Sequence, residues 1–251
     1  MTVKTDILNS DFSKYRNEEM EILERYVDQV RQHADVPEFI LYNWPCFVRS
    51  QEITRFLVYY EIFKMIQNVH GSIVQLGVLN GNTLFSYALF SEIFEHRNYT
   101  RQIFGFDTFG AYEALSDRED KDKFASKAAT YSEDFVRSAA KLFNDAQIFR
   151  QFPKVQLIKG DAVETLPAFL EQHPETMCSL LNLHTSVYEV ERQTLELMWP
   201  RMPKGAVVHM GSLAYPDSPG VTEMIQDTVG ISNVRIQRFP FATKHAFFIK
   251  E

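Results

Sequence analysis

The sequence predicts a doubly wound α/β fold whose sheet is mostly parallel and ends in an antiparallel hairpin. Short apolar runs alternate with amphipathic runs from about residue 72 to residue 229, as βαβ units require. The stretch 72–83 (SIVQLGVLNGNT) joins a strand-like run to a helix-like run through a turn that contains glycine. The last two strand-like runs, 233–239 and 243–249, are separated by a short turn only, so one of them must run antiparallel to its neighbour.

The composition is that of an ordinary globular protein and disfavours several function classes. The 251 residues are 45% hydrophobic and carry a net charge of −7, which offers no general attraction to nucleic acid or to an anionic membrane. No run has the length of a membrane span, and the N-terminus has no apolar targeting core. Cys46 and Cys178 have no ligand-like spacing and read as reduced thiols. We therefore expect a cytoplasmic protein with neither nucleic-acid nor membrane partners.

Residues 1–70 are expected to form a helical cap segment in front of the sheet domain, which would comprise 71–251. Apolar residues recur at helical spacing in 15–33 and again in 50–69, where Ser50 is a plausible N-cap. The stretch 35–49 carries two prolines and several aromatic residues, and reads as a structured loop. These apolar cap helices also favour a homo-oligomer.

The core elements follow in strict alternation. Strands are predicted at 72–77, 102–107, 154–159, 178–184 and 205–210, and helices at 82–95, 132–145, 163–172, 189–199 and 220–229. Five parallel strands followed by a hairpin is the plan of class I methyltransferases, which have a Rossmann-like sheet, rather than that of typical nicotinamide dehydrogenases. The charged stretch 108–130 is either a substrate lid or a solvated excursion.

Polar residues stand where the first three strands end. Gly77 and Gly81 let the backbone approach a ligand at the start of the helix that follows. Asp107 is placed to accept hydrogen bonds from a ribose diol, although it could also cap a helix. Asp161 could receive an adenine amino group or cap the next helix, and the sequence does not choose between the two.

Most of the chain, from about residue 48 to residue 220, resembles the macrocin O-methyltransferase family of sugar O-methyltransferases, which use S-adenosylmethionine. The matching pieces include GSIVQLGVLNGNTLFSYALFS, RQIFGFDTF, PKVQLIKGDAVETLP and PRMPKGAVV. The resemblance implies that the methionine part of the cofactor is surrounded by Gly77, Gly81, Asn82 and Thr83. It implies that Asp107 binds the ribose and that Asp161 and Ala162 bind the adenine. Gln75 and Thr108, which adjoin these positions, are expected to join the same cofactor site.

The sequence departs from the family at the positions of its metal ligands. Relatives carry an Asp-x-Asp pair after the fourth strand and an acidic pair after the fifth, and these carboxylates hold a divalent cation. Here the corresponding residues read His184-Thr185-Ser186 and Gly211-Ser212. Because Mg²⁺ requires hard oxygen ligands, we predict that the metal site of the family is absent and that no metal serves as a cofactor.

Two histidines, His184 and His209, stand where the metal chemistry would be. A neutral imidazole there could take a proton from an acceptor hydroxyl, so both residues are predicted to be catalytic. Two histidines could also bind a softer ion such as Zn²⁺, but no third ligand is evident from the sequence. A packing role for both is the remaining alternative. The other five histidines are given no role.

Three residues of the cap segment are predicted to contact the acceptor. Arg49 could reach an anionic group, although a surface ion pair is its commoner fate, and Tyr42 and Trp44 could line a pocket or simply pack.

The favoured function is methyl transfer from S-adenosylmethionine to a small hydroxylated acceptor, a sugar or a specialised metabolite, without the divalent metal that relatives use. The alternative is a non-catalytic or repurposed homologue that keeps the adenosyl pocket. A metal held by carboxylates of the charged loop, such as Asp117, Glu119, Asp120 and Asp122, is a weaker third reading. A dehydrogenase is disfavoured by the terminal hairpin.

Overall fold

The computed structural model describes residues 19–110, 115, 118–119, 132–216 and 218–251, and divides into two compact units, Met1–Leu57 and Val58–Glu251. The division falls inside helix α4 (Ser50–Ile66), and the domain boundary expected after residue 70 stays a prediction. The second half of this helix belongs to the core of the larger unit. The buried residues of α4 are Val58, Tyr59, Ile62, Phe63 and Ile66.

The smaller unit holds α2 (Glu19–Gln32), α3 (Pro37–Tyr42), a 3₁₀ turn (Trp44–Cys46) and the start of α4. Helix α2 confirms the described part of the first predicted helix, while residues 15–18 lie outside the described residues. Helix α3 corrects the loop expected over 35–49. Pro37 occupies its first turn, where a missing N–H costs nothing, so this proline starts a helix instead of breaking one.

The larger unit contains a seven-stranded sheet in the order β3-β2-β1-β4-β5-β7-β6. The parallel strands are β1 (Ser72–Leu76), β2 (Ile103–Asp107), β3 (Val155–Lys159), β4 (Cys178–Leu183) and β5 (Val207–Met210). The strands β6 (Gln237–Phe239) and β7 (Ala242–Ile249) form the predicted hairpin, and β7 is antiparallel to β5. The strand order reverses between β1 and β4, which is where ligands bind in open α/β sheets.

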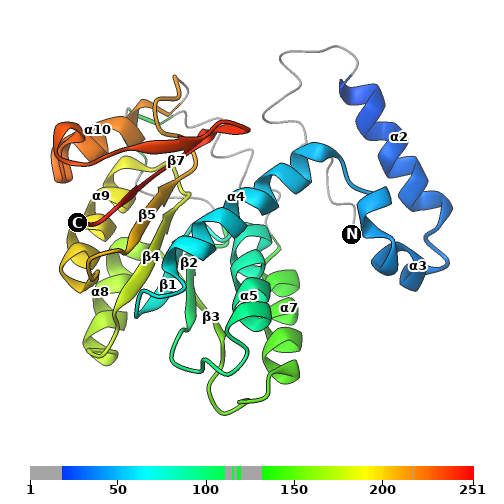
Figure 1. The fold of residues 1–251 in the computed structure, drawn as a ribbon, viewed down its shortest axis with the longest axis horizontal. Helices are drawn as coiled ribbons and strands as arrows, with labels where there is room; N and C mark the ends of the chain where they lie inside the picture. The colour runs from blue at the N-terminus through cyan, green and yellow to red at the C-terminus, as the bar shows by residue number, and fades with distance from the viewer. Residues whose placement is uncertain (1–18, 111–114, 116–117, 120–131, 217) are drawn as a thin grey trace. The chain divides into compact units, whose positions relative to one another are not determined.

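Five helices connect these strands within two residues of the predicted bounds. They are α5 (Asn82–Phe94), α7 (Glu133–Ala146), α8 (Ala162–Gln172), α9 (Tyr188–Met198) and α10 (Pro219–Thr228). Figure 1 shows α8, α9 and α10 on the side of the sheet opposite to α5 and α7. Most of the charged stretch 108–130, for which a lid was one reading, lies outside the described residues. In the described part of the chain, no helix combines the length and apolar character that a bilayer crossing needs.

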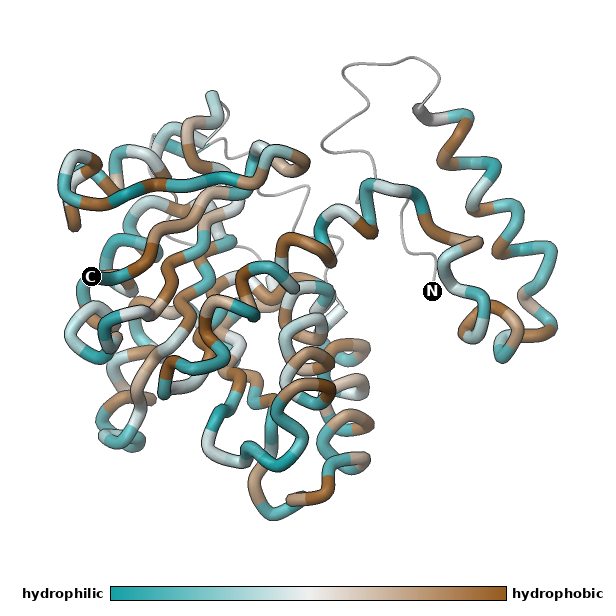
Figure 2. The backbone as a smooth tube through the Cα atoms, in the orientation of Figure 1, coloured by the Kyte–Doolittle hydropathy of each residue, from teal (hydrophilic) through white to brown (hydrophobic). Residues whose placement is uncertain are grey.

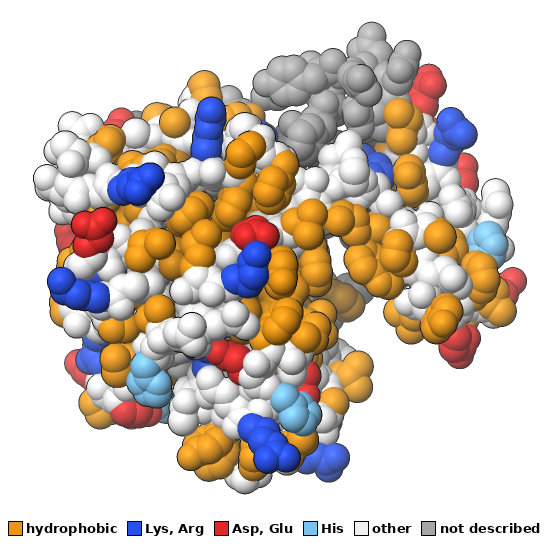
Figure 3. All heavy atoms as spheres, in the orientation of Figure 1, with side chains coloured by type: hydrophobic (Ala, Val, Ile, Leu, Met, Phe, Trp, Pro, Cys, Tyr) orange, Lys and Arg blue, Asp and Glu red, His pale blue; other side chains and the backbone are white. Residues whose placement is uncertain are grey.

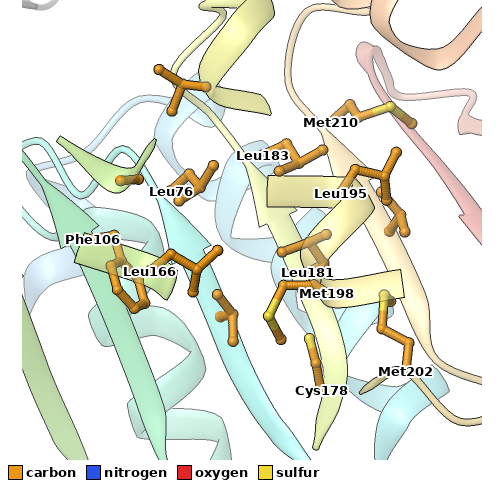
Figure 4. Close-up of a cluster of buried hydrophobic side chains, with 14 of the residues drawn as sticks. Leu76, Phe106, Leu166, Cys178, Leu181, Leu183, Leu195, Met198, Met202 and Met210 are labelled. Atoms are coloured by element: carbon orange, nitrogen blue, oxygen red, sulfur yellow. The ribbon is translucent and has the colours of Figure 1, made fainter. Parts of the chain in front are cut away.

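One sheet face is an apolar core against α8, α9 and α10. Figure 4 shows leucine, phenylalanine and sulfur-bearing side chains meeting there, among them Leu76, Phe106 and Met198. Figure 2 shows that hydrophobic residues are concentrated along the strands, whereas α2 alternates between hydrophobic and hydrophilic residues. Burying such side chains contributes about 25 cal/mol per Å² of apolar surface, which makes this face the main source of stability.

The other face of the sheet is partly polar. Gln75, Asn182 and His209 are register partners on β1, β4 and β5, so their side chains lie in one row across the sheet. All three are almost completely buried. A buried polar row is costly unless its members are hydrogen-bonded, so its presence marks this face as the place to look for a function.

The surface carries charges of both signs. In the face that Figure 3 shows, the described acidic and basic side chains are interspersed. On this face the described charges therefore form no continuous basic stretch.

Candidate functional site

The turn after β1 has the backbone geometry of a ligand-binding loop. Gly77 and Gly81 have φ values of 75° and 87°, in the left-handed region that other residues avoid. Gly81 precedes the first residue of α5, and no side chain caps this helix. The first N–H groups of α5 are therefore in the position where class I sheets meet an anionic or polar ligand. The predicted cofactor residues Asn82 and Thr83 open this helix.

Asp107 at the end of β2 fixes this turn. Its Oδ2 accepts hydrogen bonds from the N–H groups of Val78 at 2.7 Å and Leu79 at 2.9 Å, and its Oδ1 accepts one from Phe109 at 2.8 Å. Burial raises the pKa of Asp107, and the hydrogen bonds from Leu79, Phe109 and Val78 act against this rise. The sequence analysis expected this residue to bind a ribose, and the structure adds that it holds the glycine turn in place. Thr108, the next predicted cofactor residue, donates its hydroxyl proton to the carbonyl of Gly110 at 3.1 Å.

Asp161 at the end of β3 is the N-cap of α8. Its Oδ1 accepts a hydrogen bond from the N–H of Val163 at 2.9 Å. The sequence left open whether Asp161 caps a helix or binds adenine. The structure contains the capping interaction. Binding of adenine by Asp161 and its buried neighbour Ala162 stays a prediction.

Gln75 lies beneath the turn, in the polar row of the sheet. Its Nε2 donates to the carbonyl of Gly77 at 2.9 Å, while its Oε1 has no hydrogen-bond partner among the described residues. Asn182, its neighbour on β4, uses Oδ1 to accept from Nδ1 of His209 and leaves Nδ2 without such a partner. Gln75 thus supports the turn from below, as a residue that positions the ligand loop.

The two histidines singled out in the sequence lie together, and a third joins them. The ring centroids of His184 and His209 are 4.9 Å apart. His209 Nε2 lies 3.0 Å from Nδ1 of His245, and the rings of these two residues stack at 5.2 Å. Tyr59 of α4 covers the group, with ring centroids 6.0–6.4 Å from each of the three imidazoles. We call His184, His209 and His245 the histidine cluster.

His245 was given no role from the sequence, although its place in the terminal hairpin could have predicted that it lies near His209. Met210 of β5 pairs with Ala246 of β7 in the antiparallel ladder. A strand that pairs antiparallel with β5 brings its own early residues to the carboxyl end of β5. Aligning the hairpin expected at 233–249 with the fifth strand would therefore have brought His245 to His209.

The electrostatic environment keeps His209 neutral. Burial lowers its pKa well below 6.5, and the neighbouring His184 and His245 lower it further. A neutral imidazole has one protonated nitrogen and one lone pair. The Asn182 carbonyl oxygen can only accept, so the proton of His209 is on Nδ1 and the lone pair is on Nε2, facing His245.

The glycine turn approaches the backbone of His184, one member of the histidine cluster. A Cβ atom on Gly77 would come within 2.9 Å of the carbonyl oxygen of His184. The absence of a side chain at Gly77 therefore lets the turn after β1 approach the end of β4.

The predicted acceptor residues all belong to the smaller unit. Tyr42 is 88% exposed and Trp44 is 45% exposed. Arg49 forms an ion pair with Glu52, in which Arg49 Nη2 lies 2.7 Å from Glu52 Oε1. An ion pair of this kind is the alternative that the sequence left open for Arg49. Their contact with an acceptor stays a prediction.

The sequence model of one protein family, Macrocin-O-methyltransferase (TylF), matches residues 13–233. The chain belongs to the macrocin O-methyltransferase family. The resemblance seen in the sequence is thereby confirmed, and with it the class of enzyme, the O-methyltransferases. Among curated proteins no significant match is found.

Solved structures with the same fold include methyltransferases. A crystal structure of CalS11, a calicheamicin methyltransferase, is 23% identical and has a TM-score of 0.87, covering 93% of each chain. An apo structure of CalS11, described as a TDP-rhamnose 3'-O-methyltransferase, is 22% identical with a TM-score of 0.80, covering 96% of this chain and 99% of that one. The O-methyltransferase NovP is 17% identical with a TM-score of 0.63, covering 79% and 80%. These likenesses confirm the class I methyltransferase fold.

Hydroxyl groups and an imidazole lie at the two strand ends where the resemblance leads one to expect the acidic residues of the family. Thr185 Oγ1 and the Ser186 N–H donate to Glu191 Oε1 at 3.0 and 2.8 Å, and the hydroxyls of Ser186 and Ser212 lie 3.4 Å apart. Gly211 lies beside the His184 ring, and a Cβ at this position would be in ordinary van der Waals contact with the ring at 3.4 Å. Among the described residues at these two strand ends, imidazole and hydroxyl groups stand where the family was expected to hold carboxylates.

Glu191 is a buried acid that the sequence analysis missed. It lies on α9 and is 1% exposed. Burial raises its pKa to about 7, although hydrogen bonds from Ser186 and Thr185 lower it. Its role is to tie the loop after β4 to α9, and its position three residues inside a helix gave no signal for this in the sequence.

Proposed function

We propose that this protein transfers a methyl group from S-adenosylmethionine to a hydroxyl group of a small acceptor, a sugar or a sugar-bearing specialised metabolite. It does so without the carboxylate-held Mg²⁺ of its family. The observation that carries the proposal is the contact between the glycine turn and the histidine cluster, in which Gly77 lies against the backbone of His184. A cofactor in the turn would place its methyl group beside imidazoles that can accept a proton.

The cofactor would be held along the carboxyl ends of β1, β2 and β3. The turn from Gly77 to Thr83 supplies backbone N–H groups for the methionine part. Oδ2 of Asp107 already accepts two hydrogen bonds from the turn, whereas Oδ1 accepts the one from Phe109, so Oδ1 is the atom that would accept from a ribose hydroxyl. Asp161 keeps one oxygen for an adenine amino group while the other caps α8.

The chemical step is an in-line displacement. The acceptor oxygen attacks the methyl carbon, the bond from carbon to sulfur breaks, and S-adenosylhomocysteine leaves. His184 takes the hydroxyl proton as the new carbon–oxygen bond forms. His209 is buried and contacts Asn182 and His245, so it acts by positioning and polarising the cluster. Orientation of the two reactants supplies the rest of the rate.

The sugar acceptor is supported by the name of one structural relative, the TDP-rhamnose 3'-O-methyltransferase CalS11, and by the family description. We extend these names to this chain only as a class of acceptor: a hydroxyl on a sugar ring. The cytoplasmic location and the assembly into a homo-oligomer stay predictions from the sequence.

The test is methyl transfer from trideuteromethyl S-adenosylmethionine to nucleotide sugars and to glycosylated metabolites, read by mass spectrometry. We expect labelled product whose rate is unchanged by adding Mg²⁺ to reactions that contain none. His184→Ala should lose at least 10²-fold in kcat, the usual contribution of a general base. His96→Ala, at an exposed histidine far from the cluster in the sequence, should keep the full rate. Cofactor binding with no transfer to any acceptor would favour the non-catalytic homologue.

A further inference from the structure

The histidine cluster brings three nitrogen ligands from three distant stretches of the chain to one point. His184 follows β4, His209 lies in β5 and His245 lies in β7. One ring nitrogen of each lies within 4.8 Å of those of the other two. Within the described residues, this is the group of side chains that has the composition and spacing of a metal site.

The ring orientation of His209 is the one that a metal ligand needs. Histidines that bind metals usually donate the other ring N–H to a carbonyl or carboxylate, which fixes the tautomer. Here Nδ1 of His209 faces Oδ1 of Asn182, and Nε2 faces the cluster. The polar row of the sheet thus supplies an orienting partner beneath the ligand, and Asn182 is buried so that water cannot compete for this contact.

The ligand set favours a particular class of cation. Imidazole nitrogens suit Zn²⁺, Co²⁺ and Ni²⁺, whereas Mg²⁺ and Ca²⁺ require oxygen ligands. Three protein ligands with a fourth position left open is the arrangement of catalytic zinc sites. His184 and His245 are half-buried and His209 is fully buried, and Nε2 of His184 is itself shielded from solvent, so a cation bound here would be largely enclosed.

The distances between the ring nitrogen atoms of the cluster are close to those in a tetrahedral zinc site. Nitrogen atoms on a tetrahedral Zn²⁺ lie about 3.4 Å apart, given Zn–N bonds of about 2.0–2.1 Å. His209 Nε2 and His245 Nδ1 are at 3.0 Å, and no pair in the group exceeds 4.8 Å. Binding of an ion would therefore require the nitrogen atoms of the cluster to move by about 1 Å relative to one another.

We propose that His184, His209 and His245 form a binding site for one borderline transition-metal cation of the Zn²⁺ class, oriented by Asn182. The site stands in place of the carboxylate site of the family and binds a different class of ion. The proposal goes beyond methyl transfer and uses His184 differently. A neutral imidazole has one lone pair, so His184 cannot hold a cation and take the acceptor proton at the same time, and Zn²⁺ at this site should inhibit methyl transfer.

The experiment is titration of the full chain, first freed of metal with a chelator, with Co²⁺ and then with Zn²⁺ in competition with a chromophoric chelator. We expect one ion per chain and a visible Co²⁺ spectrum typical of nitrogen ligation, which Zn²⁺ removes and Mg²⁺ does not. His245→Asn should weaken Zn²⁺ binding at least 100-fold, and Asn182→Leu should weaken it 10–100-fold, as loss of an orienting partner does. The matched control is His96→Ala, which should bind as the wild type does.

The fold of each variant is checked by circular dichroism and by binding of S-adenosylhomocysteine, so that loss of the metal and loss of the cofactor site are read separately. A folded wild-type chain that takes up no Co²⁺ or Zn²⁺ would overturn the proposal. So would a His245→Asn variant that binds Zn²⁺ as tightly as the wild type. In either case the three imidazoles are a hydrogen-bonded cluster only. Failure of methyl transfer in the metal-free chain, with intact Zn²⁺ binding on titration, would leave this proposal standing and refute the proposed function.

Discussion

The Nε2 atom of His209 lies 3.0 Å from the Nδ1 atom of His245, across the antiparallel pair of β5 and β7. His245 belongs to the terminal hairpin, whose antiparallel strands distinguish this sheet from a wholly parallel one. The hairpin brings a third imidazole to the end of β5, beside the ring of His184. The hairpin therefore contributes directly to the candidate site in addition to completing the sheet.

Gly77→Ala should destabilise the protein by at least about 2 kcal/mol. The left-handed φ of 75° costs an L-residue about 1–2 kcal/mol, and the new Cβ would meet the His184 carbonyl at 2.9 Å. Chemical denaturation measures the change. Gly110→Ala is the control, because the nearest atom to its Cβ would be 3.9 Å away, and it should stay within about 0.5 kcal/mol of the wild type. Equal stability of the two variants would contradict the close approach of the turn and β4.

Asp107→Ala should loosen the glycine turn. Three backbone N–H groups, those of Val78, Leu79 and Phe109, lose their acceptor, and each buried donor left unsatisfied costs about 1–3 kcal/mol. Hydrogen exchange at Val78 and Leu79 should accelerate, and affinity for S-adenosylmethionine should fall at least tenfold. Asp161→Ala, which removes a single capping bond, should cost about 1 kcal/mol and leave exchange in the turn unchanged. Unchanged exchange in Asp107→Ala would refute the anchoring role.

Glu191→Gln should stabilise the protein at high pH only. The folded-state pKa of about 7 lies above the ordinary value of 4.5, so the folded protein holds more protons than the unfolded chain between these values. Stability contributed by this group therefore falls as pH rises from 4.5 to 7 and is lowest above 7. The difference corresponds to on the order of 3 kcal/mol, which Glu191→Gln should recover at pH 8 but not at pH 4. Glu171→Gln, which changes an exposed side chain, is the control and should stay within about 0.5 kcal/mol of the wild type. The same gain at both pH values would contradict the raised pKa.

The two thiols should react at very different rates. Cys46 is exposed, whereas Cys178 is buried in β4, where burial raises its pKa to about 12. Since the thiolate is the reactive form, Ellman's reagent should titrate one thiol in the native protein and two in guanidinium chloride. Cys46→Ser should abolish the native reaction. Rapid native labelling of that variant would show that β4 opens easily.

Arg101→Met should be among the most destabilising substitutions. Its guanidinium is paired with Glu95 at 2.8 Å and donates to Ser179 Oγ and to the carbonyls of Gly71, Ile66 and Val69, with almost no exposure. Removing one partner of a buried ion pair costs about 3–5 kcal/mol. Urea unfolding measures the loss, and Arg137→Met, at an exposed ion pair, should cost less than about 1 kcal/mol. A small loss at Arg101 would mean that Glu95 is solvated when alone.

The fold was predictable because its signals are local. Each strand of the sheet is a short apolar run, and the glycine turn is readable from Gly77 and Gly81 alone. Helix α3 was not predicted because a proline can begin a helix in its first turn or end one elsewhere. The sequence does not reveal which of the two Pro37 does.

The site was predictable only where it follows a strand end. His184 and His209 follow from the resemblance, since they occupy or adjoin the family's acidic positions. His245 depends on the register between β5 and β7, a tertiary property. Glu191 could not be predicted as a site residue because its contact with the loop after β4 forms only when α9 packs against that loop. The sequence could not assign one role to Asp161, because helix capping and ligand binding both require an acidic side chain at this position.

The most direct test of the account is calorimetric titration of the wild-type chain with S-adenosylmethionine, and separately with a nicotinamide dinucleotide. We expect one S-adenosylmethionine bound per chain and a far weaker heat, or none, from the nicotinamide cofactor. Binding of the nicotinamide cofactor in preference, or of neither, would contradict the assignment of the glycine turn and Asp107 to an adenosyl site.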